Sequence, residues 1–289
     1  MRVSLMSRIN WELFDPAKVD ARLLRLAKGA SLVEYNSNDY VTYLRNVFAD
    51  DPAICQSLDQ WGAEEREHGE ALARWAKMCD PNFDFERSLK KFKSLYSINT
   101  DVSHSIRGSR TLELIARCLV ETGTSTYYTA LADSSAEPLF AQICRQIAAE
   151  EVRHYTLFHK LLPKYQAQEK VGVLARLKVA VSRSIEAQDA ELTTAYSCAN
   201  RNGREILSHE LASDAQEFIA LGYHLYQKKH LKMVVKLGAN AVGLSSADWL
   251  SQPVSSLLAG VFKYQRWNRR NIVLPARHTS PPRSLAGSR

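Results

Sequence analysis

One pattern of glutamate and histidine occurs twice in this chain of 289 residues. Leu32-Val33-Glu34 is followed by the segment A-E-E-R-E-H (63–68), and Leu119-Val120-Glu121 is followed by A-E-E-V-R-H (149–154). The second segment begins about 30 residues after its glutamate in both halves. The repeat predicts two similar helical hairpins, each with a single glutamate on its first helix and a Glu-x-x-His motif on its second.

The spacing within each Glu-x-x-His motif suits a metal ion. Residues three apart on a helix lie on one face, so Glu65 and His68 can bind a metal together, and the second motif can do the same from another helix. Four helices then supply four carboxylates and two imidazoles, the ligand set of ferritin-like di-iron and di-manganese proteins. The six predicted ligands are Glu34, Glu65, His68, Glu121, Glu151 and His154.

The chemistry of these ligands suits iron or manganese. Oxygen and nitrogen donors suit Fe(II) or Mn(II), and four carboxylates buried without a cation would be very costly. We therefore expect two iron ions (Fe²⁺) as the cofactor, with manganese or a mixed manganese–iron pair as the alternatives. A decayed site or a pair of surface helices is the alternative to any metal at all.

The rest of the chain indicates an all-α fold. Apolar residues recur at helical spacing, and only 12 glycines and 9 prolines interrupt them. We expect a ferritin-like four-helix bundle with a di-metal centre and additional C-terminal helices. The predicted helices cover about residues 17–28, 30–49, 52–79, 83–95, 107–133, 136–163, 170–199, 203–236 and 245–265.

We expect four parts along the chain. A lead segment comes before the bundle that contains the repeat, further helices complete the domain, and the last part is a basic tail without packed structure. Their predicted limits are 1–28, 29–165, 166–265 and 266–289.

Charge and cysteine usage limit the classes of function. Most of the net charge of +7 comes from six arginines in the tail, which carries no acidic residue. The five cysteines include no C-x-x-C pair, which argues against a disulfide framework, a zinc ribbon and an iron–sulfur cluster. No apolar run is long enough to cross a bilayer, and no signal-peptide pattern opens the chain. A cytoplasmic location is therefore expected, and nucleic acid is not an expected partner.

Two further glutamates repeat with the ligands. Glu64 and Glu150 each come directly before a predicted ligand, and could bind the imidazole of the opposite motif and fix its orientation. The alternative is that both point to solvent. Of the remaining histidines, His209 and His224 on a late helix could be extra ligands, although a structural or surface role is the simpler expectation.

Four segments resemble parts of the soluble acyl-carrier-protein desaturases. The segment W-G-A-E-E-R-E-H-G-E (61–70) is similar to their W-x-A-E-E-x-x-H-G-D, and F-A-Q-I-C (140–144) with I-A-A-E-E-V-R-H (147–154) is similar to their second metal-binding segment. Glu121-Thr122-Gly123-Thr124 resembles their E-R-A-T, and Trp11 with Asp15-Pro16 resembles the start of their sequences.

The resemblance implies roles for further residues. It makes Thr124 a candidate for proton delivery near bound oxygen, and a hydroxyl that bonds the carbonyl one turn earlier is the alternative. It makes Trp11 a candidate electron route, with packing as the alternative. The candidate channel residues are Leu114, Cys118, Tyr127 and Tyr128, which could equally be plain core.

By this resemblance the protein is expected to be an O₂-dependent di-iron desaturase or hydroxylase of a fatty acyl chain on acyl carrier protein. Electrons must come from a ferredoxin or a similar donor, because the chain has no G-x-G-x-x-G unit and no cluster-binding cysteines. A homodimer is the family expectation. The alternatives are an oxygenase of the same fold acting on an amine, an aromatic or a tRNA base, and a ferroxidase or other iron-handling protein.

Overall fold

The computed structural model describes residues 3–186, 190–244 and 248–268, and these residues form helices without any strand. The predicted all-α fold is confirmed. None of the helices in the described ranges is apolar over a stretch that would cross a membrane. The elements are α1 (Leu5–Arg8), η1 (Trp11–Leu13), η2 (Pro16–Lys18), α2 (Ala21–Tyr35), α3 (Ser37–Val47), α4 (Pro52–Cys79), α5 (Phe85–Leu95), α6 (Arg110–Ser134), α7 (Pro138–Glu169), α8 (Val173–Glu186), α9 (Ala190–Asn200), α10 (Ser208–Leu225), α11 (Lys228–Ala241) and α12 (Asp248–Asn268).

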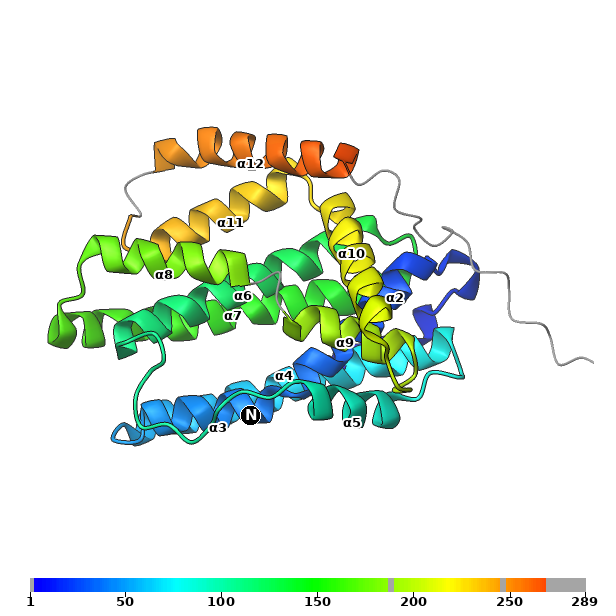
Figure 1. Cartoon of the computed structure of the whole chain (residues 1–289), viewed down its shortest axis with the longest axis horizontal. Helices are drawn as coiled ribbons and strands as arrows, with labels where there is room; N and C mark the ends of the chain where they lie inside the picture. Colours follow the sequence, from blue (N-terminus) through cyan, green and yellow to red (C-terminus); the bar gives the residue numbers. More distant parts are fainter. Residues whose placement is uncertain (1–2, 187–189, 245–247, 269–289) are drawn as a thin grey trace, which may run out of the picture.

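Four of these helices form the centre of the molecule. The helix α2 packs against α4, and α6 packs against α7 along much of its length. Figure 1 shows α6 and α7 side by side across the middle, with α3 and α4 below them and α8, α11 and α12 above. The two hairpins of the repeat therefore supply α2 with α4 and α6 with α7.

Side-chain caps fix where the long helices begin. The carboxylate of Asp51 accepts a hydrogen bond from the backbone N–H of Ile54 at the start of α4. The hydroxyl of Ser109 accepts one from Leu112 at the start of α6, and Glu137 caps α7 in the same way. Such caps satisfy N–H groups that a helix start leaves unpaired, so they stabilise the observed starts of α4, α6 and α7.

Two clusters of buried apolar side chains fill the two ends of the bundle. One contains Leu26, Leu32, Trp75 and Phe140, and the other contains Leu58, Leu114 and Phe158 among its members. On α4, α6 and α7 the predicted ligands fall between the stretches that join these two clusters, and Glu34 follows the stretch of α2 that joins the first cluster. The polar centre is therefore enclosed by apolar packing at both ends.

Several predicted helix limits were wrong. The helix end expected near Gly29 is absent, and α2 continues to Tyr35. A Cβ at Gly29 would lie 3.0 Å from the Cα of Tyr196, so the glycine allows α9 to pack closely against α2. The stop expected at Pro163 is also absent, and α7 continues to Glu169. Two features stabilise its last turns. The Tyr165 side chain is buried, and the Glu169 carboxylate accepts hydrogen bonds from two backbone N–H groups at the start of α6.

The C-terminal half contains more breaks than expected. The helix predicted over 203–236 is two helices, α10 and α11, with an extended backbone at Tyr226 between them. The one predicted over 170–199 corresponds to α8 and α9, and the residues between them lie outside the described ranges. The start at α1, η1 and η2 was not predicted, and the predicted basic tail lies outside the described residues from 269 onward.

Candidate metal centre

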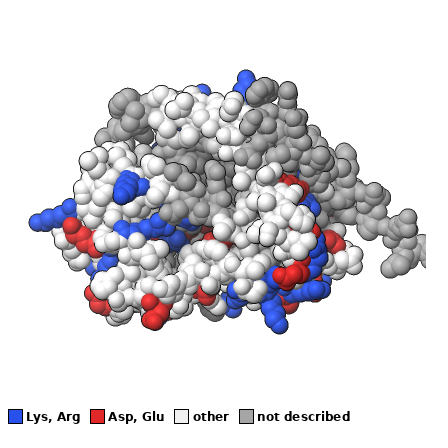
Figure 2. All heavy atoms as spheres, viewed as in Figure 1, with Lys and Arg blue, Asp and Glu red and all other residues white. Residues whose placement is uncertain are grey.

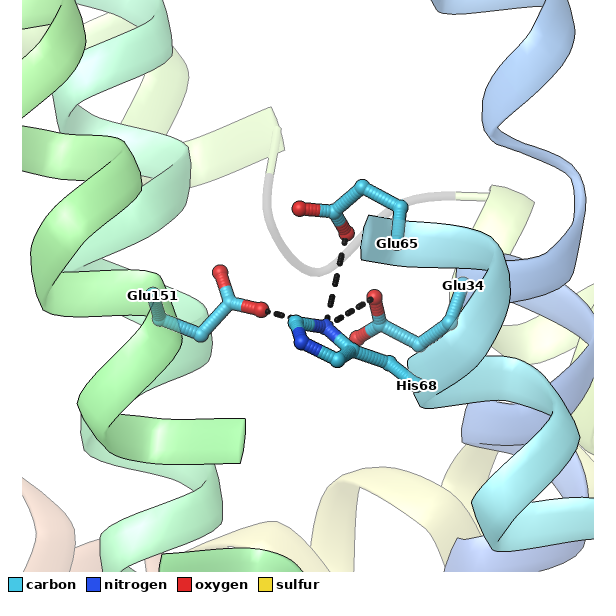
Figure 3. A group of neighbouring side chains, drawn as sticks. All are labelled: Glu34, Glu65, His68 and Glu151. Atoms are coloured by element: carbon cyan, nitrogen blue, oxygen red, sulfur yellow. Dashed lines mark ion pairs between the residues drawn. The ribbon is translucent and has the colours of Figure 1, made fainter. Parts of the chain in front are cut away.

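The six predicted ligands meet in the interior between α2, α4, α6 and α7. All of them are buried, with at most 7% of any one residue exposed. Their ligand atoms form two groups, and within each group all atoms lie within 4.8 Å of one another. One group is Glu34, Glu65, His68 and Glu151, shown in Figure 3, and the other is Glu65, Glu121, Glu151 and His154.

Two carboxylates belong to both groups. Glu65 and Glu151 each have one oxygen near His68 and the other near His154. The Nδ1 atom of His68 is 3.0 Å from Glu151 Oε1, and Nδ1 of His154 is 2.8 Å from Glu65 Oε1. The two imidazole rings are 5.7 Å apart between their centres. Two adjacent metal ions could be held here, with Glu65 and Glu151 shared between them and one further glutamate and one histidine at each end.

Several of the ligand atoms in the cluster make no hydrogen bond, although some of them lie within 3.0 Å of one another. Among the described residues, five buried ligand atoms have no hydrogen-bond partner: Oε1 of Glu65, Nδ1 of His68, Oε1 of Glu121, Oε1 of Glu151 and Nδ1 of His154. Buried polar atoms are rarely left unpaired, because each costs free energy. Five such atoms aimed at one small space fit a pair of bound cations.

The shifted pKa values of the cluster residues also fit a site for cations. Burial and the neighbouring Glu151 and Glu34 raise the pKa of Glu65 well above its usual range, and burial raises the pKa of Glu121 to about 8. Burial opposes charge on His68 and His154 too, yet the surrounding carboxylates raise the pKa of both imidazoles. Burial opposes ionisation of Glu151 as well, but the two imidazoles lower its pKa well below the usual range. Without metal, protons neutralise the charges that cations would otherwise balance.

Each imidazole is held from behind by a buried glutamate. Glu150 Oε2 lies 2.9 Å from Nε2 of His68, and Glu64 Oε2 lies 2.8 Å from Nε2 of His154. Each glutamate belongs to the motif opposite its histidine. With Nε2 as the donor, the lone pair of Nδ1 is left facing the centre, which is the tautomer a metal needs.

Arginines hold one of these glutamates in turn, which the sequence did not predict. Glu150 accepts a hydrogen bond from Arg8 of α1 and lies 2.8 Å from Nη2 of Arg153. The segment at Ser4 and Leu5 is also bound to α4, because Glu67 accepts hydrogen bonds from Ser4 Oγ and Leu5 N. No periodic pattern marks Arg8, so only the three-dimensional arrangement shows its contact with Glu150.

Thr124 reaches the cluster. Its hydroxyl donates to Glu151 Oε2 at 2.6 Å, and it also lies 3.2 Å from the carbonyl oxygen of Val120 one turn earlier. The contact with Glu151 is the one that a role near the metals requires, and the contact with Val120 is the one expected of any helical threonine. Its role in proton delivery stays a prediction.

Trp11 lies further out. Its indole N–H donates to the carbonyl oxygen of Met6 at 3.4 Å, and the guanidinium carbon of Arg74 lies 3.8 Å from the centre of its ring. It packs partly buried against the first apolar cluster. The structure thus gives Trp11 a packing role, and an electron route through it stays a prediction.

The four candidate channel residues differ in their surroundings. Leu114 and Cys118 are fully buried in the apolar cluster at one end, and Tyr127 lies against the other cluster. Tyr128 is buried as well, and its hydroxyl donates to Glu34 Oε1. Tyr128 therefore supports a candidate ligand, a contact that the helical spacing alone did not reveal. His209 and His224 lie exposed on α10 and belong to neither ligand group.

Metal binding should depend on pH. A metal must displace protons from Glu65, Glu121 and the two imidazoles, whose pKa values are all raised. These protons are held more weakly as the pH rises, so the affinity for Fe(II) should increase between about pH 6 and about pH 8. Anaerobic competition with a chelator of known affinity measures this change, and an affinity that is constant over the range would contradict it.

Comparison with known proteins identifies the family. Residues 35–188, more than half of the chain, match the model of the family described as fatty acid desaturase. The matched segment contains five of the six cluster residues, all except Glu34. No curated protein matches the chain. Fatty acid desaturases are oxidoreductases that act on fatty acyl chains. The chain belongs to the fatty acid desaturase family.

Proposed function

We propose that this protein is a di-iron oxidoreductase that uses O₂ to remove hydrogen from, or add oxygen to, an unactivated C–H bond of a fatty acyl chain. The observation that carries the proposal is the pair of buried ligand groups that share Glu65 and Glu151. Membership of the fatty acid desaturase family supports acyl chemistry at that centre.

The residues of the cluster have different proposed roles. Glu65 and Glu151 would bridge two ions, while Glu34 with His68 and Glu121 with His154 would complete one end each. Bound iron would supply the activation of O₂ and the oxidation of the C–H bond. Glu64 and Glu150 orient the imidazoles, and the Thr124 hydroxyl can hold a proton beside Glu151. The apolar clusters at both ends exclude water.

The proposed reaction requires an electron donor and a carrier for the acyl chain. A ferredoxin or a similar protein would supply the electrons, and an acyl carrier protein would present the chain. An acyl carrier protein is acidic, and the lysines of α5 and α11 are candidate contacts for it. Some of these lysines already pair within the molecule, Lys91 with Glu205 and Lys229 with Asp133. Figure 2 likewise shows basic and acidic side chains beside each other on one face.

Product analysis tests this function. The full chain is loaded anaerobically with Fe(II), then given a ferredoxin system, O₂ and acyl carrier proteins with saturated chains of several lengths. We expect mass spectrometry to show loss of two hydrogens or gain of one oxygen on at least one chain, and no change without iron. If no acyl substrate changes although the protein holds its iron, the proposed function is wrong.

A further inference from the structure

The N-terminal segment, α1 with the two residues that follow it, is bound along one face of α7. Gln142 Oε1 accepts a hydrogen bond from the backbone N–H of Asn10 at 3.0 Å. Gln146 Nε2 donates to the carbonyl oxygen of Arg8 at 3.1 Å, and Glu150 accepts a hydrogen bond from the guanidinium of the same arginine. Residues four apart on a helix share a face, so these three side chains of α7 hold the segment together.

Arg8 is the residue of this segment that connects it to the metal centre. Its guanidinium and that of Arg153 both contact Oε1 of Glu150. The other oxygen of this carboxylate lies 2.9 Å from Nε2 of His68, and both Glu150 and His68 are fully buried. A buried carboxylate is costly unless cations or hydrogen bonds accompany it. The two arginines therefore stabilise Glu150 in the orientation that presents Oε2 to His68.

The two arginines reach Glu150 from different parts of the chain. Arg153 lies three residues after Glu150, so its contact forms within α7. The contact of Arg8 forms only when the N-terminal segment is in place, with Leu5 and Ile9 buried in the first apolar cluster. The Arg8 side chain is 33% exposed and that of Arg153 is 50% exposed, so water screens the Arg8 contact less.

The histidine of the other metal position is supported in a different way. Glu64 Oε2 lies 2.8 Å from Nε2 of His154, and Glu64 Oε1 accepts a hydrogen bond from Gln60 Nε2 at 3.0 Å. Gln60 lies one turn before Glu64 on α4, so this support forms within one helix. The N-terminal segment therefore contacts the support of His68, while this hydrogen bond behind His154 forms without it.

We infer that Arg8 is a positioning residue for one of the two metal positions: through Glu150 it holds His68 in the orientation that binds an ion together with Glu34. The inference rests on the proposed function, because it assigns a role toward the di-iron centre. Removing a group that orients a metal-bound histidine typically lowers metal affinity by roughly ten- to a hundredfold. Arg153 would remain on the same oxygen, so the lower end of this range is expected for loss of Arg8.

Anaerobic titration of the full chain with Fe(II), in competition with a chelator, tests the inference without relying on activity. We expect Arg8→Met to weaken iron binding about tenfold and Arg8→Lys to retain part of the affinity. Arg74→Met is the matched control and should keep the wild-type affinity. Arg74 of α4 also binds the start of the chain, but through the Trp11 ring, whose centre lies 3.8 Å from the guanidinium carbon.

Two further backgrounds identify the metal position that Arg8 supports. His154→Ala leaves the His68 position intact, so Arg8→Met should still weaken iron binding about tenfold in that background. His68→Ala removes the group through which Arg8 acts, so Arg8→Met should have no further effect there. If His68→Ala holds no iron, Glu150→Gln replaces it in the comparison with the same expectation.

Three results would overturn the inference: unchanged affinity in Arg8→Met, an equal loss in Arg74→Met, or the same loss with and without His68. If Arg8→Met does not fold, Arg8→Lys is compared in the same two backgrounds. Wild-type iron affinity in Arg8→Met, in a protein that oxidises acyl chains, would refute the inference and leave the proposed function standing. The expected loss of affinity in a protein that oxidises no acyl chain would do the reverse.

Discussion

Replacing Glu151 by alanine is expected to remove both metal ions and with them all oxidation of acyl chains. Glu151 belongs to both ligand groups and lies 3.0 Å from Nδ1 of His68 and 3.8 Å from Nδ1 of His154. Its loss therefore takes one carboxylate from each metal position. Glu34 belongs to one group only, so Glu34→Ala should lower the metal content less. Elemental analysis of the purified, iron-loaded proteins measures the difference.

Glu67→Ala is the matched control for this prediction. Glu67 lies in the same repeated segment, but its carboxylate accepts hydrogen bonds from Ser4 and Leu5 instead of facing the cluster. This variant should hold as much iron as the wild-type protein. Full metal content in Glu151→Ala would show that Glu151 is not a bridging ligand.

Replacing Gly69 by alanine is expected to destabilise the protein strongly. A Cβ at this position would lie 2.6 Å from the backbone nitrogen of Tyr35 and 2.9 Å from the carbonyl oxygen of Ser31. Both atoms belong to the backbone of α2, so α2 and α4 would have to move apart. We expect the free energy of unfolding to fall by about 3 kcal/mol. Because Glu34 and His68 lie at this contact, iron binding should weaken too, and urea unfolding with metal analysis measures both effects.

Gly123→Ala separates this clash from the general effect of adding a methyl group. Gly123 lies in the interior of α6, and a Cβ there would meet nothing within 4 Å. Alanine favours the helix over glycine by roughly 0.5–1 kcal/mol, so this variant should be slightly more stable than the wild-type protein. An unchanged free energy of unfolding in Gly69→Ala would mean that α2 and α4 are not in such close contact.

The sequence predicted the features that repeat or follow a period. The duplicated glutamate and Glu-x-x-His pattern identified all six side chains that the structure brings together, and the limits of α4 were predicted to the residue. Features that depend on distant contacts were missed. Gly29 and Pro163 suggested helix ends, but packing against α9 and the contacts of the last turns of α7 carry the helices past them. The break at Tyr226 has no glycine or proline to mark it.

The surroundings of the centre were harder to predict for the same reason. Glu64 and Glu150 repeat with the ligands, so their contacts with the imidazoles could be expected. Arg8 has no counterpart in the other half of the chain. Its hydrogen bond to Glu150 depends on α1 and α7 meeting after folding, and no local sequence pattern marks that contact.

We propose that one chain holds two metal ions that share Glu65 and Glu151. Mössbauer spectroscopy on protein loaded with isotopically enriched iron and exposed to O₂, together with the iron content per chain, tests it most directly. We expect two irons per chain whose spins are coupled, because shared carboxylates would connect them. One iron per chain, none, or two magnetically isolated irons would contradict it.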